Sequence, residues 1–308
     1  FMENDKTIIC IPTYKRPNYL KKNLSSILNQ SIDRKFEIIV VDNDVNRSGE
    51  LSVNQMKNPK IPIEYYVEIN RGISSVRNRC IQLCKDKQAN YLIFIDDDEI
   101  ADSNWLKNLF YTEKKYNAQI VVGPVLCLYE QKPSQPIKDV FFNRLRAKTG
   151  SVMKHGATGN ILINMKIFKE FDNQPFHNFF NLIGGGDTHF LNKTISRGIE
   201  LIWADNAIAY EFISKERSSL KNCLIRSFYR GTSAFHLFKF QNGLFKSFIK
   251  SLINALILML DVIRLLVFII IINRTKMLKI IKKILRGFGF ILAIFNYSNK
   301  EYSTTFGN

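Results

Sequence analysis

Residues 91–99 read YLIFIDDDE, an apolar run that ends in four consecutive acids. Tyr91 to Ile95 are aromatic, β-branched or otherwise apolar, which is typical of a strand buried on both faces of a sheet. Unpaired carboxylates cannot continue into a hydrophobic core, because removing them from water costs too much free energy. We therefore expect Asp96 to Glu99 at the carboxyl edge of a sheet, where open α/β sheets bind ligands.

The acidic run allows two interpretations. Adjacent carboxylates repel one another, and a hard divalent cation relieves the repulsion by taking oxygen ligands, so Asp96 and Asp98 can share a nucleotide–metal assembly. Alternatively, the acids form a solvated turn that leads into a helix with Asp102 or Ser103 as its N-cap. The run taken alone does not decide between them.

The segments that precede this run predict a parallel sheet. The apolar run 36–41 (FEIIVV) also ends in acids, Asp42 and Asp44. Strands and helices alternate at a spacing that is typical of parallel strands joined by right-handed crossovers. The expected elements are strands at 7–11, 36–41, 61–69 and 91–95, and helices that open near Pro17 and cover about 74–85.

Strand ends that meet at one sheet edge form a single crevice. Asp42 is placed to accept hydrogen bonds from a uracil-type base or from ribose hydroxyls. Arg77, on the helix after Gly72, has the planar fork that suits phosphate. The alternative for Arg77 is an ion pair with an acid such as Glu68.

Composition and charge narrow the class of protein. The 308 residues are 46% hydrophobic and 12% aromatic, which fits a globular chain. Of the net charge of +17, the segment 214–308 carries +13 and the first 213 residues only +4. We therefore expect a basic tail with its own partner and no nucleic acid. Five cysteines without paired metal spacing, and no signal-peptide pattern in FMENDKTIIC, favour buried free thiols in a reducing compartment.

Four stretches in this order resemble family 2 glycosyltransferases of the GT-A fold. The resemblance implies a Rossmann-like domain with a mostly parallel sheet and flanking helices that binds a nucleotide sugar. It places Asp42 on the nucleobase, Asp96 near the ribose or uridine, and Asp98 on a Mn²⁺ or Mg²⁺ ion that bridges the diphosphate. It also counts Pro12, Thr13, Arg16, Arg77 and Asp97 among the donor-binding residues. The four stretches are PTYKRPNYL at 12–20, VVDND at 40–44, NRGISSVRN at 70–78 and FIDDDE at 94–99.

The same resemblance assigns the next segments to the acceptor half. Residues 129–155 have mixed polarity and two prolines, so we expect a mobile loop that crosses the site. ATGNILIN at 157–164 resembles the family's glycine–asparagine strand, which places Asn160 near the donor sugar. The alternative is that this sequence forms a surface strand with a glycine in the turn before it.

Three glycines followed by an acid, GGGD at 184–187, open a further predicted helix. In the family, an acid at the head of this helix is the catalytic base, so the resemblance assigns that role to Asp187. The family usually has Glu directly before it, where this chain has Gly186. The alternative is that Asp187 is only the N-cap of the helix.

The stretch 201–219, LIWADNAIAYEFISKERSS, resembles the strands and loop that close the site. Many relatives carry a metal-binding His near the position of Glu211, so Glu211 is a candidate metal ligand. The alternative is a buried carboxylate paired with Arg217. Arg217, which the resemblance counts as donor-binding, belongs with Arg226 and Arg230 to a basic stretch that resembles transferases of bacterial surface polysaccharides.

The implied reaction is inverting sugar transfer from a nucleotide sugar, with UDP expected, to a hydroxyl of a lipid-linked or oligosaccharide acceptor. Asp187 removes the hydroxyl proton, and metal and arginine hold the charge of the departing diphosphate. One alternative is a sugar-phosphate nucleotidyltransferase, although PTYKRP lacks the glycine-rich phosphate loop expected there. The other is a membrane-associated nucleotide-binding or scaffold protein with an inactive GT-A domain.

We expect a catalytic domain at 1–213, with a donor half to about 123 and an acceptor half from 124, followed by a helical tail at 214–308. Segment 252–273 is apolar but contains Asp261 and Arg264, which leaves open whether it spans a bilayer. Lysines and arginines recur at helical spacing over 276–286, which predicts an amphipathic helix on an anionic membrane surface. The expected setting is a capsule, exopolysaccharide or lipopolysaccharide pathway at the cytoplasmic face of the bacterial inner membrane. The alternative is a helical subdomain packed on the catalytic core or on a second subunit as a homo-oligomer.

Overall fold

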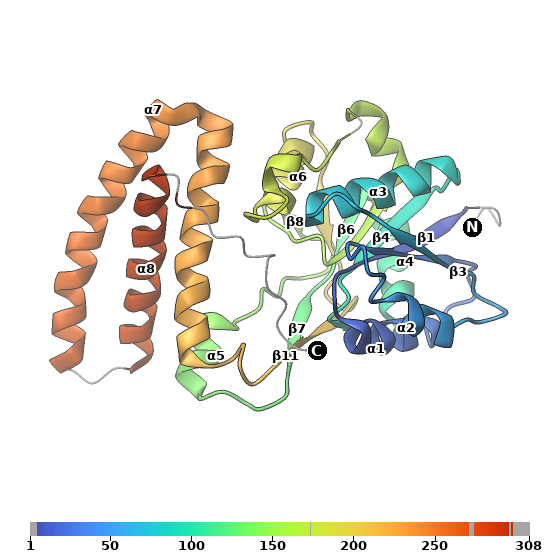
Figure 1. The fold of residues 1–308 in the computed structure, drawn as a ribbon, viewed down its shortest axis with the longest axis horizontal. Coiled ribbons are helices and arrows are strands. Elements are labelled where there is room, and N and C mark those ends of the chain that lie inside the picture. The colour runs from blue at the N-terminus through green and yellow to red at the C-terminus, as the bar shows by residue number, and fades with distance from the viewer. Residues whose placement is uncertain (1–4, 173, 271–273, 296, 298–308) are drawn as a thin grey trace.

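A large, mostly parallel sheet lies in the right-hand part of the molecule in Figure 1. The computed structural model describes residues 5–172, 174–270, 274–295 and 297. Strands β3, β2, β1 and β4 lie side by side and parallel, which confirms the predicted α/β class. Strands β9 and β8 run antiparallel to their neighbours, and β6 and β10 pair in parallel. In sheet order the strands are β3 (Ile63–Val67), β2 (Glu37–Asp42), β1 (Thr7–Thr13), β4 (Tyr91–Ile95), β9 (Asn160–Asn164), β6 (Ile120–Val122), β10 (Leu201–Trp203) and β8 (Val152–Met153).

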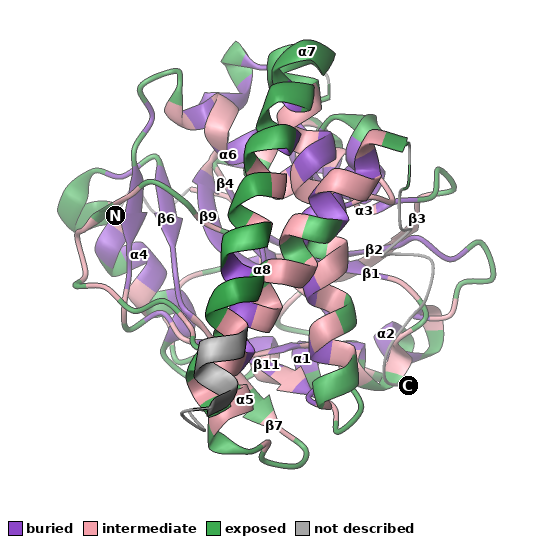
Figure 2. Cartoon of the chain, turned by 90° about the vertical axis from the view of Figure 1, so that its left-hand side faces the viewer, coloured by how far each residue is buried: buried purple, intermediate pink, exposed green. Residues whose placement is uncertain are grey.

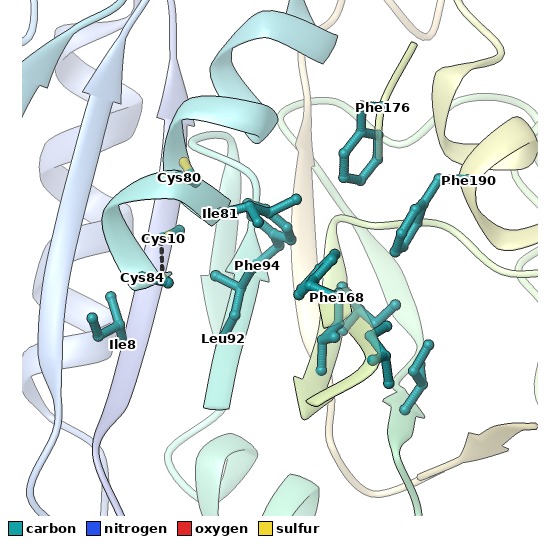
Figure 3. Close-up of a cluster of buried hydrophobic side chains, with 14 of the residues drawn as sticks. Ile8, Cys10, Cys80, Ile81, Cys84, Leu92, Phe94, Phe168, Phe176 and Phe190 are labelled. Carbon is teal, nitrogen blue, oxygen red and sulfur yellow. Dashed lines mark hydrogen bonds between the residues drawn. The ribbon is translucent and has the colours of Figure 1, made fainter. Parts of the chain in front are cut away.

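Both faces of this sheet are buried, as the unbroken apolar runs predict. Along β1, Ile8 and Cys10 join a core cluster on one face, and Ile9 and Ile11 join a second cluster on the other. The first cluster includes side chains of two helices and a group of phenylalanines (Figure 3). The two helices on this first face are α3 (Ile73–Asp86) and α6 (Gly186–Ile195). The second cluster includes side chains of α1 (Pro17–Leu28) and α4 (Trp105–Tyr116) on the other face.

The strand ends that carry the polar residues line up at one edge. Thr13 at the end of β1 pairs with Asp42 at the end of β2, and β4 ends beside them at Ile95, just before the acids. Helix α1 starts at Pro17, whose fixed φ suits a first helical position. The loop from Thr13 to Arg16 is thereby held over this edge.

A second, three-stranded sheet closes the far side of the acids. It consists of β5 (Glu99–Ala101), β11 (Ala209–Ile213) and β7 (Val125–Tyr129), and it pairs Glu99 with Glu211. The segment 129–155, expected to be a mobile loop, is partly regular, since it contains α5 (Gln135–Phe141) and β8. The remaining short elements are α2 (Glu50–Gln55) and the 3-10 helices Met165–Glu170, Asn178–Phe180 and Ala293–Phe295.

Two long helices form a hairpin beside the two sheets (Figure 1). Helix α7 (Leu220–Ile270) is broken at Gly243, whose φ of 81° and ψ of 171° are not helical. We call residues 220–242 its first arm and residues 244–270 its second arm. Helix α8 (Arg274–Leu292) lies between the two arms in the view of Figure 1.

The first arm approaches α8 closely because each helix presents a glycine to the backbone of the other. A Cβ atom on Gly231 would lie 2.0 Å from the carbonyl oxygen of Arg286, and one on Gly289 would lie 2.2 Å from that of Phe228. Such backbone contact between helices requires residues without side chains at these points. In the part of the chain that the structure describes, no helix combines the length and the hydropathy that crossing a bilayer requires.

The cysteines follow the expectation of free thiols. All five are unpaired, and Cys10, Cys80, Cys84 and Cys223 are buried. The Sγ atoms of Cys10 and Cys84 lie 3.7 Å apart, and burial raises the pKa of the Cys10 thiol. These side chains act as small apolar groups of the core.

Candidate active site

The acids after β4 meet an arginine and a threonine from the loop after β1. Thr13 Oγ1 donates to Asp97 Oδ2 at 2.7 Å, and Arg16 Nη1 donates to Asp97 Oδ1 and Asp98 Oδ2, both at 3.1 Å. Asp97 is nearly buried, whereas the side chain of Asp96 keeps 37% of its surface exposed. The run is therefore no solvated turn, since guanidinium and hydroxyl groups hold two of its carboxylates.

A second arginine reaches Asp98 from the opposite side. Arg217 Nη1 donates to Asp98 Oδ2 at 3.3 Å, and its Nη2 donates to Glu211. Arg144, which the sequence did not single out, also donates to Glu211. The pairing of Glu211 with Arg217, left open by the sequence, is what the structure shows. The metal-ligand role of Glu211 stays a prediction.

The need for Arg144 follows from the burial of Glu211. The side chain of Glu211 is only 11% exposed, so its buried negative charge requires positively charged partners. The sequence predicted one of them, Arg217. The second comes from the segment expected to be a mobile loop, where one basic residue among several carries no distinguishing pattern. Burial alone would raise the pKa of Glu211, but Arg217 and Arg144 outweigh it and lower the pKa.

Arg77 connects the acids that follow β4 with Asp187, the residue predicted as the base. It extends from α3, is 3% exposed, and donates through Nη1 to Asp187 and through Nη2 to Asp96 Oδ1 at 3.3 Å. The structure shows the alternative, an ion pair, but with these two acids as partners, and phosphate binding by Arg77 stays a prediction. Glu68, the acid named from the sequence, accepts from the backbone N–H of Asn70 at 2.7 Å.

Asp187 lies in the first turn of α6 and does not cap it. The N-cap residue is Gly185, with a φ of 92°, so the interpretation of Asp187 as N-cap is wrong. Gly186, at the position where the family usually has Glu, lies close to α3. A Cβ atom there would lie 3.1 Å from Ser74 Oγ, so the close approach of α6 to α3 favours glycine. The carboxylate of Asp187 accepts a hydrogen bond from Arg77 instead of capping the helix.

Three of the remaining predicted donor-binding residues are buried. Asp42 is fully buried and accepts from the N–H groups of Gly49 and Asp44 and from Tyr65 Oη, at 2.7 to 2.9 Å. Burial raises the pKa of Asp42, which these hydrogen bonds partly offset. Pro12 is buried at the end of β1. Contact of Asp42 and Pro12 with a nucleobase stays a prediction.

Asn160 is the third of these residues, and it joins three elements. Its amide nitrogen donates to the carbonyls of Pro124 and Ala207 at 3.0 and 2.8 Å, and its oxygen accepts from Trp105 Nε1 at 2.8 Å. The preceding glycine is the residue next to the acids. A Cβ atom on Gly159 would lie 2.7 Å from Glu99 Oε1 and 2.9 Å from Asp96 Oδ2. Gly159 therefore packs directly against the acids, and Asn160 holds the neighbouring segments in place.

Burial raises several pKa values in this cluster, in which carboxylates outnumber guanidinium groups. Burial raises the pKa of Asp96 to about 7 against the opposing charge of Arg77, and that of Asp97 to about 6 against Arg16. Glu99, buried beside Asp96 and Asp98, has a pKa well above its ordinary value. The members are the carboxylates of Asp96, Asp97, Asp98, Glu99, Asp187 and Glu211 and the guanidinium groups of Arg16, Arg77, Arg144 and Arg217.

This excess of negative charge suits a divalent cation that arrives with a diphosphate. Among the described residues, no group of three or more His, Cys, Asp or Glu side chains has the arrangement of a metal site. Nucleotide-bound Mg²⁺ commonly takes one or two carboxylates, with phosphate and water oxygens as its other ligands. The hard oxygens of Asp96 and Asp98 fit such a shared site.

Comparison with known proteins gives a family match over much of the chain. Residues 8–172 match the model described as Glycosyl transferase family 2. The succinoglycan biosynthesis protein ExoM of Rhizobium meliloti is 27% identical over 228 residues, which cover 72% of each chain. The poly(ribitol-phosphate) beta-N-acetylglucosaminyltransferase TarP of Staphylococcus aureus is 29% identical over 121 residues, 38% of this chain and 36% of that relative.

Solved structures share the fold at low sequence identity. S. aureus TarS 1-349 in complex with UDP superposes with a TM-score of 0.55 and 14% identity, covering 94% of this chain and 91% of that one. The mannosyltransferase PcManGT of Pyrobaculum calidifontis, in complex with GDP-Man and Mn²⁺, has a TM-score of 0.52 and 16% identity, covering 75% and 62%. At these identities the likeness establishes the fold alone.

Proposed function

The chain belongs to glycosyl transferase family 2, and from this membership we propose that it moves a sugar from a nucleotide-sugar donor, with UDP as the nucleotide, to an acceptor hydroxyl with inversion. One observation carries the proposal. A single guanidinium, that of Arg77, contacts both Asp96 on the donor edge and Asp187 at the head of α6. The two acids that the reaction needs on opposite sides of the transferred sugar therefore belong to one cluster.

In the proposed mechanism Asp187 is the general base. Its carboxylate takes the proton of the acceptor hydroxyl, the hydroxyl oxygen forms a bond to the anomeric carbon, and the bond to the diphosphate breaks with its electron pair on the leaving oxygen. Attack from the face opposite the leaving group inverts the anomeric centre. Asp187 is released for this role when Arg77 turns from it toward the donor phosphates.

The arginines of the cluster are proposed to exchange carboxylate partners for phosphate. Arg16 and Arg217 both contact Asp98 in the structure, so an incoming diphosphate finds two guanidinium groups already at its binding position. Asp98, with Asp96, would hold Mn²⁺ or Mg²⁺, which when bound neutralises charge on the departing diphosphate. Glu211 reaches the metal only if Arg144 and Arg217 leave it.

The relatives suggest a setting for this activity. ExoM is named for succinoglycan biosynthesis and TarP for transfer to poly(ribitol-phosphate), both polymers of bacterial surfaces. We propose a glycan or lipid-linked acceptor of this kind, at the cytoplasmic face of the bacterial inner membrane. In this proposal residues 1–213 form the catalytic domain, and residues 214–308 form the region that attaches to the membrane.

The test is a thermal-shift panel of nucleotide sugars, with and without Mn²⁺. A donor present at about 100 times its Kd stabilises the folded protein by about 2.7 kcal/mol, which a melting curve resolves. The donors that shift the curve are then assayed for release of nucleoside diphosphate with oligosaccharide acceptors. EDTA is expected to abolish turnover, and full activity in EDTA would contradict the metal assignment alone. Binding without turnover for every donor and acceptor would favour the inactive-domain alternative.

A further inference from the structure

The second arm of α7 has its apolar side chains on the outside. Phe245 is 77% exposed, Met259 66% and Leu256 65%. Figure 2 shows exposed residues along the described part of this arm, on the side of the molecule away from the large sheet. The exposed apolar residues are Leu244, Phe245, Phe248, Ile249, Leu252, Ile253, Leu256, Ile257, Met259, Leu260, Val262 and Ile263. We call these twelve residues the outer face.

The fully buried side chains of the same arm are small or polar, and the apolar Leu258 faces α8 beside them. Ser247, Ser251 and Asp261 are at most 4% exposed. The serine hydroxyls donate to the backbone carbonyls four residues earlier, at 2.7 and 2.9 Å, so they are satisfied within the helix. A helix of a water-soluble protein has the opposite arrangement, with its apolar stripe inward.

Helix α8 contributes its own apolar side chains to the interior of the hairpin. Leu278, Ile280 and Phe290 are each less than 10% exposed, and Phe290 packs with Phe235 of the first arm. The sequence predicted that α8 would lie with its apolar side on a membrane. That prediction is wrong for the buried residues of α8, because they face the protein.

The positive charge around the outer face indicates that the partner that covers this face is negatively charged. Lys246, Lys250 and Arg264 are exposed on the same arm. Between residues 220 and 295 there are thirteen Lys or Arg residues and one acid, Asp261, so the segment carries +12. That acid is itself paired with Arg264 at 3.1 Å. Two such hairpins would repel one another, whereas anionic lipid headgroups attract both.

We propose that the outer face of α7 inserts into the interfacial layer of an anionic lipid bilayer, with α8 behind it on the protein side. Apolar side chains then enter the acyl boundary while the flanking lysines and arginines meet the headgroups. The inference rests on the proposed function for its purpose, which is to bring the enzyme to a lipid-linked acceptor.

The position of the base relative to the hairpin agrees with that purpose. Phe240 of the first arm packs against His189 of α6, with ring centroids 5.2 Å apart, and Ser233 Oγ donates to the carbonyl of Ile183. Helix α6, which carries Asp187, therefore packs directly on the hairpin. Attachment through the outer face places the acceptor side of the site next to the helices that hold the membrane.

The experiment is vesicle flotation of the full chain with phosphatidylglycerol–phosphatidylcholine vesicles and with phosphatidylcholine vesicles. The test variant replaces Phe245, Leu256 and Met259 by Gln. These side chains are exposed, so the fold is expected to persist. The matched control replaces three exposed apolar residues of the catalytic half, Leu51, Tyr111 and Leu128, by Gln. We expect wild type and control to float with the anionic vesicles, and the test variant to bind them at least about tenfold more weakly.

Three results would overturn the inference. They are equal binding of the test variant and wild type, equal binding to neutral and anionic vesicles, and a lipid-free dimer that the test variant converts to monomer without vesicle binding. The last result would make the outer face a contact between copies of the chain. UDP-sugar binding, measured on the same samples, tests the proposed function separately. Protein that floats but binds no nucleotide sugar would contradict the function and leave the membrane face intact.

Discussion

At the scale of single residues, the site is a set of carboxylates whose partners are arginines from distant parts of the chain. Asp98 contacts Arg16 from the loop after β1 and Arg217 from the segment before α7. Glu211 contacts Arg144 and Arg217, and Arg77 contacts Asp96 and Asp187. A ligand that enters this cluster replaces existing ion pairs, so its affinity is a difference between two sets of charge contacts.

The first prediction concerns the proposed base. Asp187→Asn keeps the size of the side chain but cannot accept the acceptor's proton, so the rate of sugar transfer is expected to fall by about 10²- to 10⁴-fold. Binding of the nucleotide sugar is expected to survive, because Arg77 keeps Asp96 as a partner. The measurement is kcat for transfer alongside Kd for the donor. The control, Asp172→Asn, changes an exposed acid that pairs with Lys193. Near wild-type transfer by the Asp187 variant would assign Asp187 to a structural role.

The second prediction concerns pH. The folded-state pKa of Glu99 is raised by burial and by Asp96, Asp98 and Glu211, so its contribution to stability is present below the unfolded pKa and is lost as pH rises through the folded value. Asp97 and Asp96, with pKa values of about 6 and about 7, act in the same direction. Without metal, the free energy of unfolding is therefore expected to fall between pH 5 and pH 8.

Glu99→Gln is expected to reduce that slope, by up to about 1.4 kcal/mol per pH unit between the unfolded and folded pKa values of Glu99. The measurement is urea unfolding at several pH values in metal-free buffer. The control is Glu50→Gln. The exposed Glu50 has a pKa lowered by Arg47, so its contribution is constant above pH 5 and the slope is expected to stay unchanged. A Glu99 variant with the wild-type slope would show that folding does not raise the pKa of Glu99.

At the scale of elements, the hairpin depends on helices that touch backbone to backbone. Gly289→Ala would place a Cβ atom 2.2 Å from the carbonyl oxygen of Phe228, so α8 must shift. We expect a loss of about 1–3 kcal/mol in the free energy of unfolding and earlier proteolysis of the hairpin. The control is Gly287→Ala, whose Cβ would meet a flexible side-chain atom of Leu258 at 3.1 Å. Equal stability of the two variants would contradict the close packing of α7 and α8.

The sequence predicted well a strand that is buried on both faces and a helix with one buried side. β4 spans the expected residues Tyr91–Ile95, and α3 extends the expected 74–85 by one residue at each end. Such strands have an unbroken apolar run that chain-local patterns reveal. The membrane placement of α8 was wrong for its buried residues, because an amphipathic pattern shows only that one side of a helix is apolar, and α7 covers part of that side. The contacts of Arg77 with Asp187 and of Arg144 with Glu211 join residues that are 110 and 67 positions apart, so no local sequence pattern reveals them.

At the scale of the whole molecule, charge and catalysis are separated along the chain. Residues 1–213 carry +4 and the remaining residues +13. Each acid and arginine of the cluster precedes residue 220. Truncation after residue 240 keeps the contact of Phe240 with α6 but removes the outer face and α8. We expect the truncated protein to bind nucleotide sugar within a few fold of wild type and to lose binding to anionic vesicles.

Calorimetry of donor binding and vesicle flotation on the same preparation measure both effects. Loss of donor binding together with loss of the native melting transition would show that the catalytic half needs the hairpin to fold. Vesicle binding retained by the truncated protein would place the membrane contact in the catalytic half.

The link that Arg77 makes between two acids also constrains how the sequence can vary. Replacing Arg77 alone leaves Asp96 and Asp187 facing one another without the cation between them, and replacing either acid leaves a buried guanidinium with one anchor fewer. Intermediates in which one of the three has changed are therefore selected against, and the three positions are expected to be inherited as a unit. In an alignment of relatives, Arg77, Asp96 and Asp187 should be kept or exchanged together. Frequent relatives that retain both acids without the arginine would show that the link is dispensable.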